Sequence, residues 1–310
     1  RIKNYRIMCG VSGVIAKNLV KIDSFVRMNQ IIKHRGPDDE GFVLFSDSEY
    51  KVLGSNDTAK ETWEAKGIYL PINKGAQTTF QAPVAFGHRR LSILDLSPKG
   101  HQPMCGDDRR YWITFNGEIY NYIEIRDELI QLGYSFNTDT DTEVIINAYK
   151  QWGIDCQHKF NGMWAFAIYD TIEKSIFLSR DRFGIKPLYY WFSTEGDFYF
   201  GSEIKQFTAL PGWRAVLNKE RAFDYLYYAL TDHTDETLFK GVYILPPGCS
   251  FESKIKNVKS DNGKITFFKW YHPVTSTTKM SFNEAKAHFL EKFKDSIKLH
   301  LRADVPLGSA

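Results

Sequence analysis

Short apolar segments separated by turn residues dominate the first 200 residues of the chain. They are rich in aromatic and β-branched residues, which pack well on the pleated surface of a sheet. We therefore predict β-strands at residues 11–16, 84–88, 111–115, 165–169, 175–179, 188–192 and 198–201.

Helical spacing of apolar residues, at intervals of three and four, occurs at residues 24–32, 121–132, 142–152 and about 282–301. The last segment begins with Ser281 and Glu284, the pattern of a capping box. Helices among many hairpin-like strands favour an α+β layered domain over a doubly wound parallel sheet. Residues 54–80 are polar and irregular, which predicts an insertion or a long surface loop.

Composition and charge exclude several functional classes. Hydrophobic residues make up 43% of the 310 residues and the formal net charge is +3, so neither nucleic acid nor an anionic membrane is an expected partner. No apolar stretch approaches the ~20 residues of a membrane span. The cysteines form no C-x-x-C pair, which predicts no zinc site and favours a reducing, cytoplasmic setting; they are Cys9, Cys105, Cys156 and Cys249.

Polar motifs directly follow two of the predicted strands. An arginine such as Arg90 at the end of a strand suits a carboxylate, which it can bind with two parallel hydrogen bonds, although stacking on a neighbouring aromatic ring is the structural alternative. The Asn116 amide and the Gly117 N–H can direct two donors at one oxygen, as an oxyanion hole requires, although Asn-Gly is also an ordinary turn signal. Cys9 taken alone indicates only a small buried residue.

Taken together, the motifs resemble the class II glutamine amidotransferases, which are N-terminal-nucleophile hydrolases, and above all the glutamine-dependent asparagine synthetases. The matching motifs, in order, are Met-Cys-Gly at 8–10, His-Arg-Gly-Pro-Asp at 34–38, Arg-Leu-Ser-Ile at 90–93, Asn-Gly-Glu-Ile-Tyr-Asn at 116–121, Thr-Asp-Thr-Asp-Thr-Glu-Val at 138–144, Gly-Met-Trp-Ala-Phe-Ala at 162–167, Arg-Asp-Arg-Phe-Gly-Ile-Lys-Pro-Leu-Tyr at 180–189 and Gly-Ser-Glu at 201–203. The resemblance implies a four-layer αββα sandwich of two antiparallel sheets, followed by the first helix of a truncated α/β synthetase domain.

The resemblance also implies a role for each candidate residue. It implies that Cys9 is the nucleophile and that Asn116 and Gly117 stabilise the oxyanion. It implies that glutamine is held by Arg90 at its α-carboxylate, by Glu118 and Asp141 at its α-ammonium, and along its length by Leu91, Ser92, Ile93 and Leu94. A zwitterionic substrate suits a pocket with a cation and carboxylates on opposite sides.

In this family the base is the α-amine of the cysteine itself, whose pKa of ~7.7–8.0 suits proton transfer near neutral pH. Residues 1–8 precede Cys9 here, and a peptide nitrogen is not a base. We therefore expect this extension to be absent from the active protein. Our preferred interpretation is that Met8 is the true start and is trimmed by an aminopeptidase; the alternative is that processing removes residues 1–8. We predict a glutaminase domain at 9–252, a linker or edge hairpin at 253–279 and the truncated start of a synthetase domain at 280–310.

Residues 304–310 resemble the lead-in to the family's pyrophosphate-binding loop, but not the loop itself. The resemblance thus implies no cofactor and no metal for the glutaminase half, and ATP with Mg²⁺ for the missing half. The full-length enzyme would act on L-glutamine, L-aspartate and ATP, and a homodimer is compatible with it. Two alternatives stay open: an amidotransferase with another carboxylate acceptor, such as a sugar acid or a cell-surface precursor, and a non-catalytic docking domain.

Overall fold

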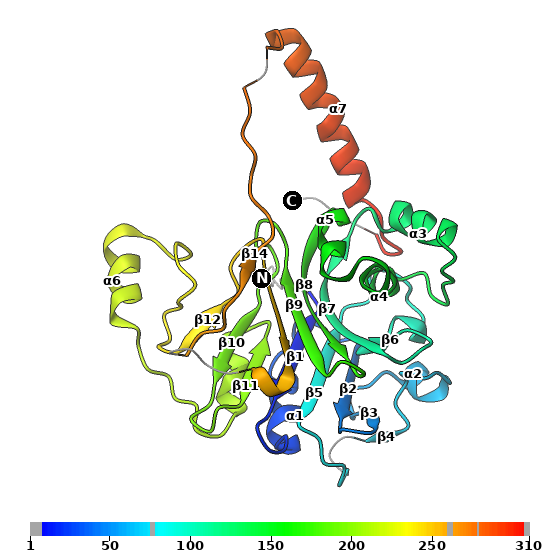
Figure 1. Ribbon diagram of the computed structural model, residues 1–310, viewed down its shortest axis with the longest axis vertical. Coiled ribbons are helices and arrows are strands. Elements are labelled where there is room, and N and C mark those ends of the chain that lie inside the picture. Colours follow the sequence, from blue (N-terminus) through cyan, green and yellow to red (C-terminus); the bar gives the residue numbers. More distant parts are fainter. Residues whose placement is uncertain (1–7, 75–77, 259–262, 278, 307–310) are drawn as a thin grey trace.

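The computed structural model describes residues 8–74, 78–258, 263–277 and 279–306. Two β-sheets pack face to face, and helices cover both outer faces (Figure 1). The predicted α+β sandwich is therefore confirmed. The N-terminal extension before Met8 and the last residues of the pyrophosphate-loop lead-in lie outside the described residues.

Most strands pair antiparallel with their neighbours, as predicted. In spatial order, the larger sheet contains β12 (Val242–Ile244), β10 (Tyr189–Phe192), β11 (Phe198–Gly201), β1 (Gly10–Ile15), β5 (Val84–Arg90), β2 (Asp39–Phe45), β3 (Tyr50–Gly54) and β4 (Asn73–Lys74). The smaller sheet contains β14 (Phe268–Lys269), β13 (Cys249–Lys254), β9 (Ser175–Arg180), β8 (Gly162–Asp170), β7 (Tyr111–Ile119) and β6 (Met104–Cys105). The pair β3–β4 is parallel, so the larger sheet is mixed at this edge.

The helices flank the sheets. The α-helices are α1 (Ile22–Gln30), α2 (Lys60–Glu64), α3 (Tyr122–Gln131), α4 (Asp141–Trp152), α5 (Cys156–Lys159), α6 (Lys219–Tyr228) and α7 (Phe282–His300). Short 3-10 helices occur at Pro98–Gly100, Gly153–Asp155, Ile204–Ala209 and Ile255–Asn257. Within the described ranges, no helix has the length and apolar content needed to cross a membrane.

The main core lies between the two sheets and is largely aromatic. The rings of Phe45 and Tyr169 lie 4.6 Å apart between centroids, and Phe86 packs edge-on against Phe200 at 5.7 Å. A second apolar cluster joins the smaller sheet to α3 and α4, and a third joins the larger sheet to α1. Each buried large side chain contributes about 1.5–3 kcal/mol, so these layers hold the sheets in a fixed relation.

The sequence predicted most of these elements within a few residues. The elements that were not anticipated are β2, β3, β6, β12, β13, α5 and α6, and residues 54–80 contain α2 and β4 and not only a loop. Strand β2 escaped notice because it begins with two acidic residues that are nevertheless buried. Asp39 pairs with His101 at 2.6 Å, and Glu40 pairs with Arg89 at 2.8 Å. Such distant partners leave no periodic signal in the sequence.

Helix α7 begins with the predicted capping box: Ser281 and Glu284 satisfy each other's backbone N–H groups. None of its residues is buried, and the helix projects away from the sandwich (Figure 1). Just before it, β13 pairs with the short strand β14, so the region predicted as a linker or edge hairpin adds an edge strand to the smaller sheet.

Buried hydrogen bonds connect β5 in one sheet to β7 in the other. The imidazole of His88 donates from Nε2 to the carbonyl of Phe115 at 2.9 Å, and the Thr114 hydroxyl donates to the carbonyl of Gly87 at 3.0 Å. Burial lowers the pKa of His88 to about 3, so the ring stays neutral near pH 7. These hydrogen bonds fix the position of β5 relative to β7 where the two strands face each other.

We predict that His88 makes the stability of the fold depend on acid. Below about pH 6.5 the unfolded chain protonates this histidine while the folded chain does not, so stability falls by up to about 1.4 kcal/mol per pH unit as the pH drops towards 3. Urea unfolding at pH 7.5 and pH 5.5 measures the effect. The variant His88→Gln keeps a donor of similar reach and should lose this part of the pH dependence; an equal loss of stability in both proteins would contradict the prediction.

Candidate active site

A cavity of about 310 Å³ lies where β1, β5 and β7 meet the loops that follow β5 and precede α4. Of the residues predicted for the site, it brings together Cys9, Arg90, Leu91, Ile93, Leu94, Asn116, Gly117, Glu118 and Asp141. Ser92 does not line the cavity; its backbone N–H donates instead to the Asp38 carboxylate at 2.8 Å. The segments therefore converge as the motifs suggested, apart from this one side chain.

Cys9 lies just before β1, at the wall of the cavity. Its Sγ accepts a hydrogen bond from the Leu91 N–H at 3.3 Å, and its carbonyl accepts one from Arg35 Nε at 2.9 Å. Burial raises the pKa of the thiol, and the Leu91 hydrogen bond together with nearby Arg90 and Lys186 partly offsets that rise. A thiol in this state needs a base before it can act as a strong nucleophile.

Asn116 and Gly117 lie within β7, which continues to Ile119 where a turn was the alternative. The strand can continue because Gly117 has no side chain: a Cβ there would lie 2.1 Å from the carbonyl oxygen of Met163 on the paired strand β8. The amide nitrogen Nδ2 of Asn116 is buried and, among the described residues, has no hydrogen-bond partner. A buried donor without a partner costs about 1–3 kcal/mol and is suited to an incoming acceptor.

Arg90 ends β5 and organises the loop that follows it. Its guanidinium donates to the carbonyls of Ser97 at 2.9 Å and Leu94 at 3.3 Å, and also to that of Asp95. Gly100 makes room for it, since a Cβ there would lie 1.8 Å from Nη2 of Arg90. Arg90 is thus both a wall of the cavity and the support of its own loop, a structural role that the sequence motif did not suggest.

Burial raises the pKa of two carboxyl groups in the cavity, those of Asp141 and Glu118. Asp141, at the start of α4, accepts a hydrogen bond from the Ile119 N–H at 2.9 Å, and burial raises its pKa to about 7. Burial likewise raises the pKa of Glu118, while nearby Lys186 and His300 oppose the rise. A ligand ammonium beside these carboxyls would favour their ionised forms.

Lys186 is a cavity residue for which the sequence analysis assigned no role. Its Nζ lies 2.9 Å from Sδ of Met8, and burial lowers the pKa of its ammonium. Lys186 belongs to the Arg-Asp-Arg-Phe-Gly-Ile-Lys-Pro motif, so the motif itself was the available signal.

Gln102 was also missed; its Oε1 accepts from the Phe115 N–H at 2.8 Å and so fixes the residue before Asn116.

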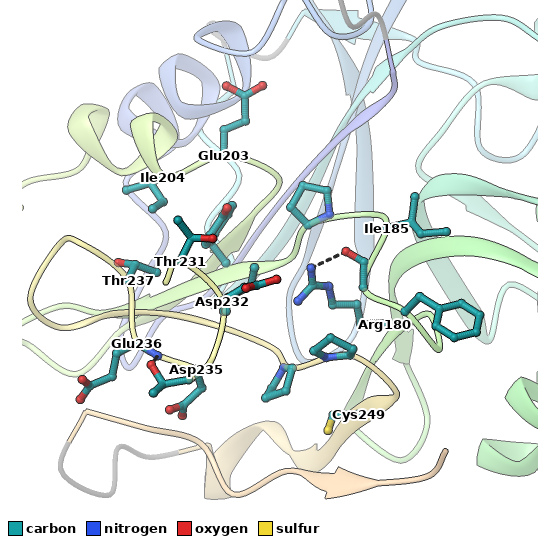
Figure 2. A pocket seen from close by; sticks show the side chains of 18 of the residues that line it. Arg180, Ile185, Glu203, Ile204, Thr231, Asp232, Asp235, Glu236, Thr237 and Cys249 are labelled. Atoms are coloured by element: carbon teal, nitrogen blue, oxygen red, sulfur yellow. Dashed lines mark hydrogen bonds between the residues drawn. The ribbon is translucent and has the colours of Figure 1, made fainter. Parts of the chain in front are cut away.

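A second, larger hollow of about 1440 Å³ lies on the other side of Met8 and Ile185, which line both spaces. Figure 2 shows Asp232, Asp235 and Glu236 on one side of this hollow and Arg180 across from them. Of the residues predicted for the site, none lines it. Size alone would favour this hollow, but the cavity at Cys9 combines a nucleophile, an unpaired donor and opposite charges, and is the better candidate.

Comparison with known proteins identifies the family of the chain. A family model described as a glutamine amidotransferase domain matches residues 73–265. The chain belongs to the glutamine amidotransferase family. A putative glutamine-hydrolysing asparagine synthetase 2 of Methanocaldococcus jannaschii is 33% identical over 97% of this chain and 54% of its own length. Asparagine synthetase 1 of Bacillus subtilis strain 168 is 33% identical over 97% of this chain and 41% of its own length.

Among solved structures, this amidotransferase is similar to the glutamine phosphoribosylpyrophosphate amidotransferase of B. subtilis. The TM-score is 0.58 at 17% identity, over 83% of this chain and 50% of that one, so the likeness concerns the fold. The chain spans about half the length of the curated relatives that it matches. The family is one of enzymes.

Within the described part of the amidotransferase, no group of three or more histidine, cysteine, aspartate or glutamate residues is arranged to hold a metal ion. Of the cysteines, Cys9 is partly accessible, whereas the other three, Cys105, Cys156 and Cys249, are buried.

We predict that Cys9 is the first thiol of the folded amidotransferase to react with a small alkylating reagent. The reason is its exposure to the cavity, and the rate should still rise with pH beyond the ordinary thiol pKa of ~8.5, because burial raises the pKa of this thiol. Iodoacetamide labelling followed by peptide mass spectrometry checks this. Cys9→Ala is the control and should slow the first labelling event; early modification of Cys105 or Cys156 would contradict the prediction.

Proposed function

We propose that this chain hydrolyses the side-chain amide of L-glutamine to glutamate and ammonia, with Cys9 as the nucleophile. The observation that carries the proposal is the unpartnered Asn116 Nδ2 in the same cavity as the Cys9 thiol. An oxyanion hole needs a donor that is already fixed and dry before the oxyanion forms. Membership of the glutamine amidotransferase family supports glutamine as the substrate.

The charges of the cavity suit a zwitterion. Arg90 and the carboxyls of Glu118 and Asp141 come from different segments and can receive the α-carboxylate and the α-ammonium respectively. Because the Asp141 pKa is about 7, it is partly protonated in the free protein at neutral pH. The ammonium of glutamine would draw it to the ionised form, so binding should weaken as the pH falls below about 7.

The reaction would proceed in two halves. The α-amine of Cys9 takes the thiol proton, Sγ bonds to the amide carbon, and the electron pair moves to the oxygen held by Asn116 and the Gly117 N–H. Collapse of this intermediate breaks the C–N bond, and the amine returns the proton to the leaving ammonia. The amine then takes a proton from water as the water oxygen bonds to the thioester carbon; the S–C bond breaks, the amine returns the proton to Sγ, and glutamate leaves.

We further propose that the ammonia serves a second portion of the protein, which activates aspartate with ATP and Mg²⁺. The proposal rests on relatives named glutamine-hydrolysing asparagine synthetases, of which this chain matches about half. Among the described residues we assign none to an ATP site. The identity of the amide acceptor is likewise taken only from the names of these relatives.

We predict that Asn116→Ala lowers kcat for glutamine hydrolysis by about 10²–10³, the usual scale for one oxyanion donor, with a small change in KM. The hydrogen bond from Asn116 to the oxyanion forms in the transition state, so its loss lowers kcat more than it changes KM. Steady-state ammonia release measures it. Asn218→Ala removes the same side chain at the N-cap of distant α6 and should leave kcat unchanged; a kcat of Asn116→Ala within threefold of the parent would exclude the assigned role.

We predict that a chain beginning at Cys9 releases ammonia from glutamine, whereas a chain beginning at Arg1 does not. In the longer chain the Cys9 nitrogen is a peptide nitrogen, since Met8 precedes it, and it cannot accept the thiol proton. Intact mass spectrometry of each preparation must accompany the assay. Equal activity in a sample that still carries Arg1 would rule out the α-amine as the base.

A further inference from the structure

Residues 300–304, which begin with the last residue of α7, contact two separate segments that flank the Cys9 cavity. Neither contact was expected from the sequence, and the candidate site described above does not include this segment. We call it the 300–304 clamp.

The first contact is with the loop after β5. The Asp304 N–H donates to the Ile93 carbonyl at 2.9 Å, and the Asp95 N–H donates to Oδ2 of Asp304 at 2.7 Å. Asp95 has a φ of 47°, a left-handed conformation that non-glycine residues adopt only with outside support. The carbonyl of the same Asp95 accepts a hydrogen bond from Arg90. Asp304 is therefore connected through a single residue, Asp95, to the guanidinium of Arg90.

The second contact is with the segment that follows β7. The guanidinium of Arg302 makes two parallel hydrogen bonds of 2.6 Å to the carboxylate of Glu124 on α3, and it also donates to the Tyr120 carbonyl at 2.6 Å. The ring of His300 lies 3.9 Å from that of Tyr120, between centroids. Tyr120 is two residues beyond Glu118. Bidentate pairs of this kind fix orientation as well as distance.

The clamp thus joins the two walls that carry opposite charges. One end fixes the loop that Arg90 supports, and the other fixes the end of the strand that carries Glu118. We propose that Arg302 and Asp304 are positioning residues for glutamine: they set the separation between the groups that receive its carboxylate and its ammonium. This inference rests on the proposed glutaminase function and adds residues that do not touch the substrate.

The test is steady-state kinetics on the chain that begins at Cys9. Asp304→Ala and Arg302→Met should each raise KM for glutamine about 5- to 10-fold, as expected for one or two lost hydrogen bonds, with kcat within twofold of the parent. Asp304→Asn keeps an acceptor for the Asp95 N–H and should restore most of the affinity. Lys298→Met, which removes an exposed cation from the last turn of α7, is the matched control and should behave as the parent.

A double-variant cycle separates positioning from general stability. If Asp304 acts through Arg90, then Asp304→Ala should add little to the KM of an Arg90→Met protein. An unchanged KM in Asp304→Ala would overturn this inference and leave the proposed function intact. The same holds if Asp304→Ala lowers both kcat and thermal stability but does not change KM. Calorimetric binding of glutamine to Cys9→Ala, with and without Asp304→Ala, repeats the test without turnover; absence of any glutamine binding there would overturn the proposed function together with the clamp.

Discussion

The contact between β5 and β7 across the sandwich is the constraint on which the candidate site depends. Arg90 belongs to one sheet and Asn116 to the other, so no hydrogen-bond ladder connects them directly. The cross-sheet bonds of His88 and Thr114, both buried, supply that connection in a dry interior where each bond is costly to break. If the sheets slid by one residue, Arg90 would shift by about 3.3 Å relative to Asn116, and the two walls of the cavity would no longer match.

Several features that lower the stability of the fold occur where the chemistry is proposed. Asn116 Nδ2 lacks a partner in the described chain, Asp141 has a raised pKa through burial, and Gly117 leaves β7 without a side chain at the point of closest approach to β8. Proteins rarely retain such features away from functional sites, because each lowers a small net stability. The aromatic core between the sheets is large enough to offset them.

The sequence predicted the strands with alternating or continuous apolar residues and the helices α1, α3, α4 and α7, and all but one of the site residues that it predicted line the cavity. It did so because those features are local or belong to recognisable motifs. It missed β2, whose Asp39 and Glu40 look like a surface turn until His101 and Arg89 are brought beside them. It also gave no role to Lys186 and no contact to Asp304, since both depend on segments more than 170 residues apart.

The position of β1 between β5 and β11 has a consequence for synthesis of the protein. The strand that follows Cys9 cannot complete its pairing until residues 198–201 have left the ribosome. At about 5–20 residues per second, β1 stays incompletely paired for roughly ten to forty seconds. Any enzyme that trims the chain next to Cys9 therefore has a long interval in which the peptide bond is still exposed, before the cavity forms around it.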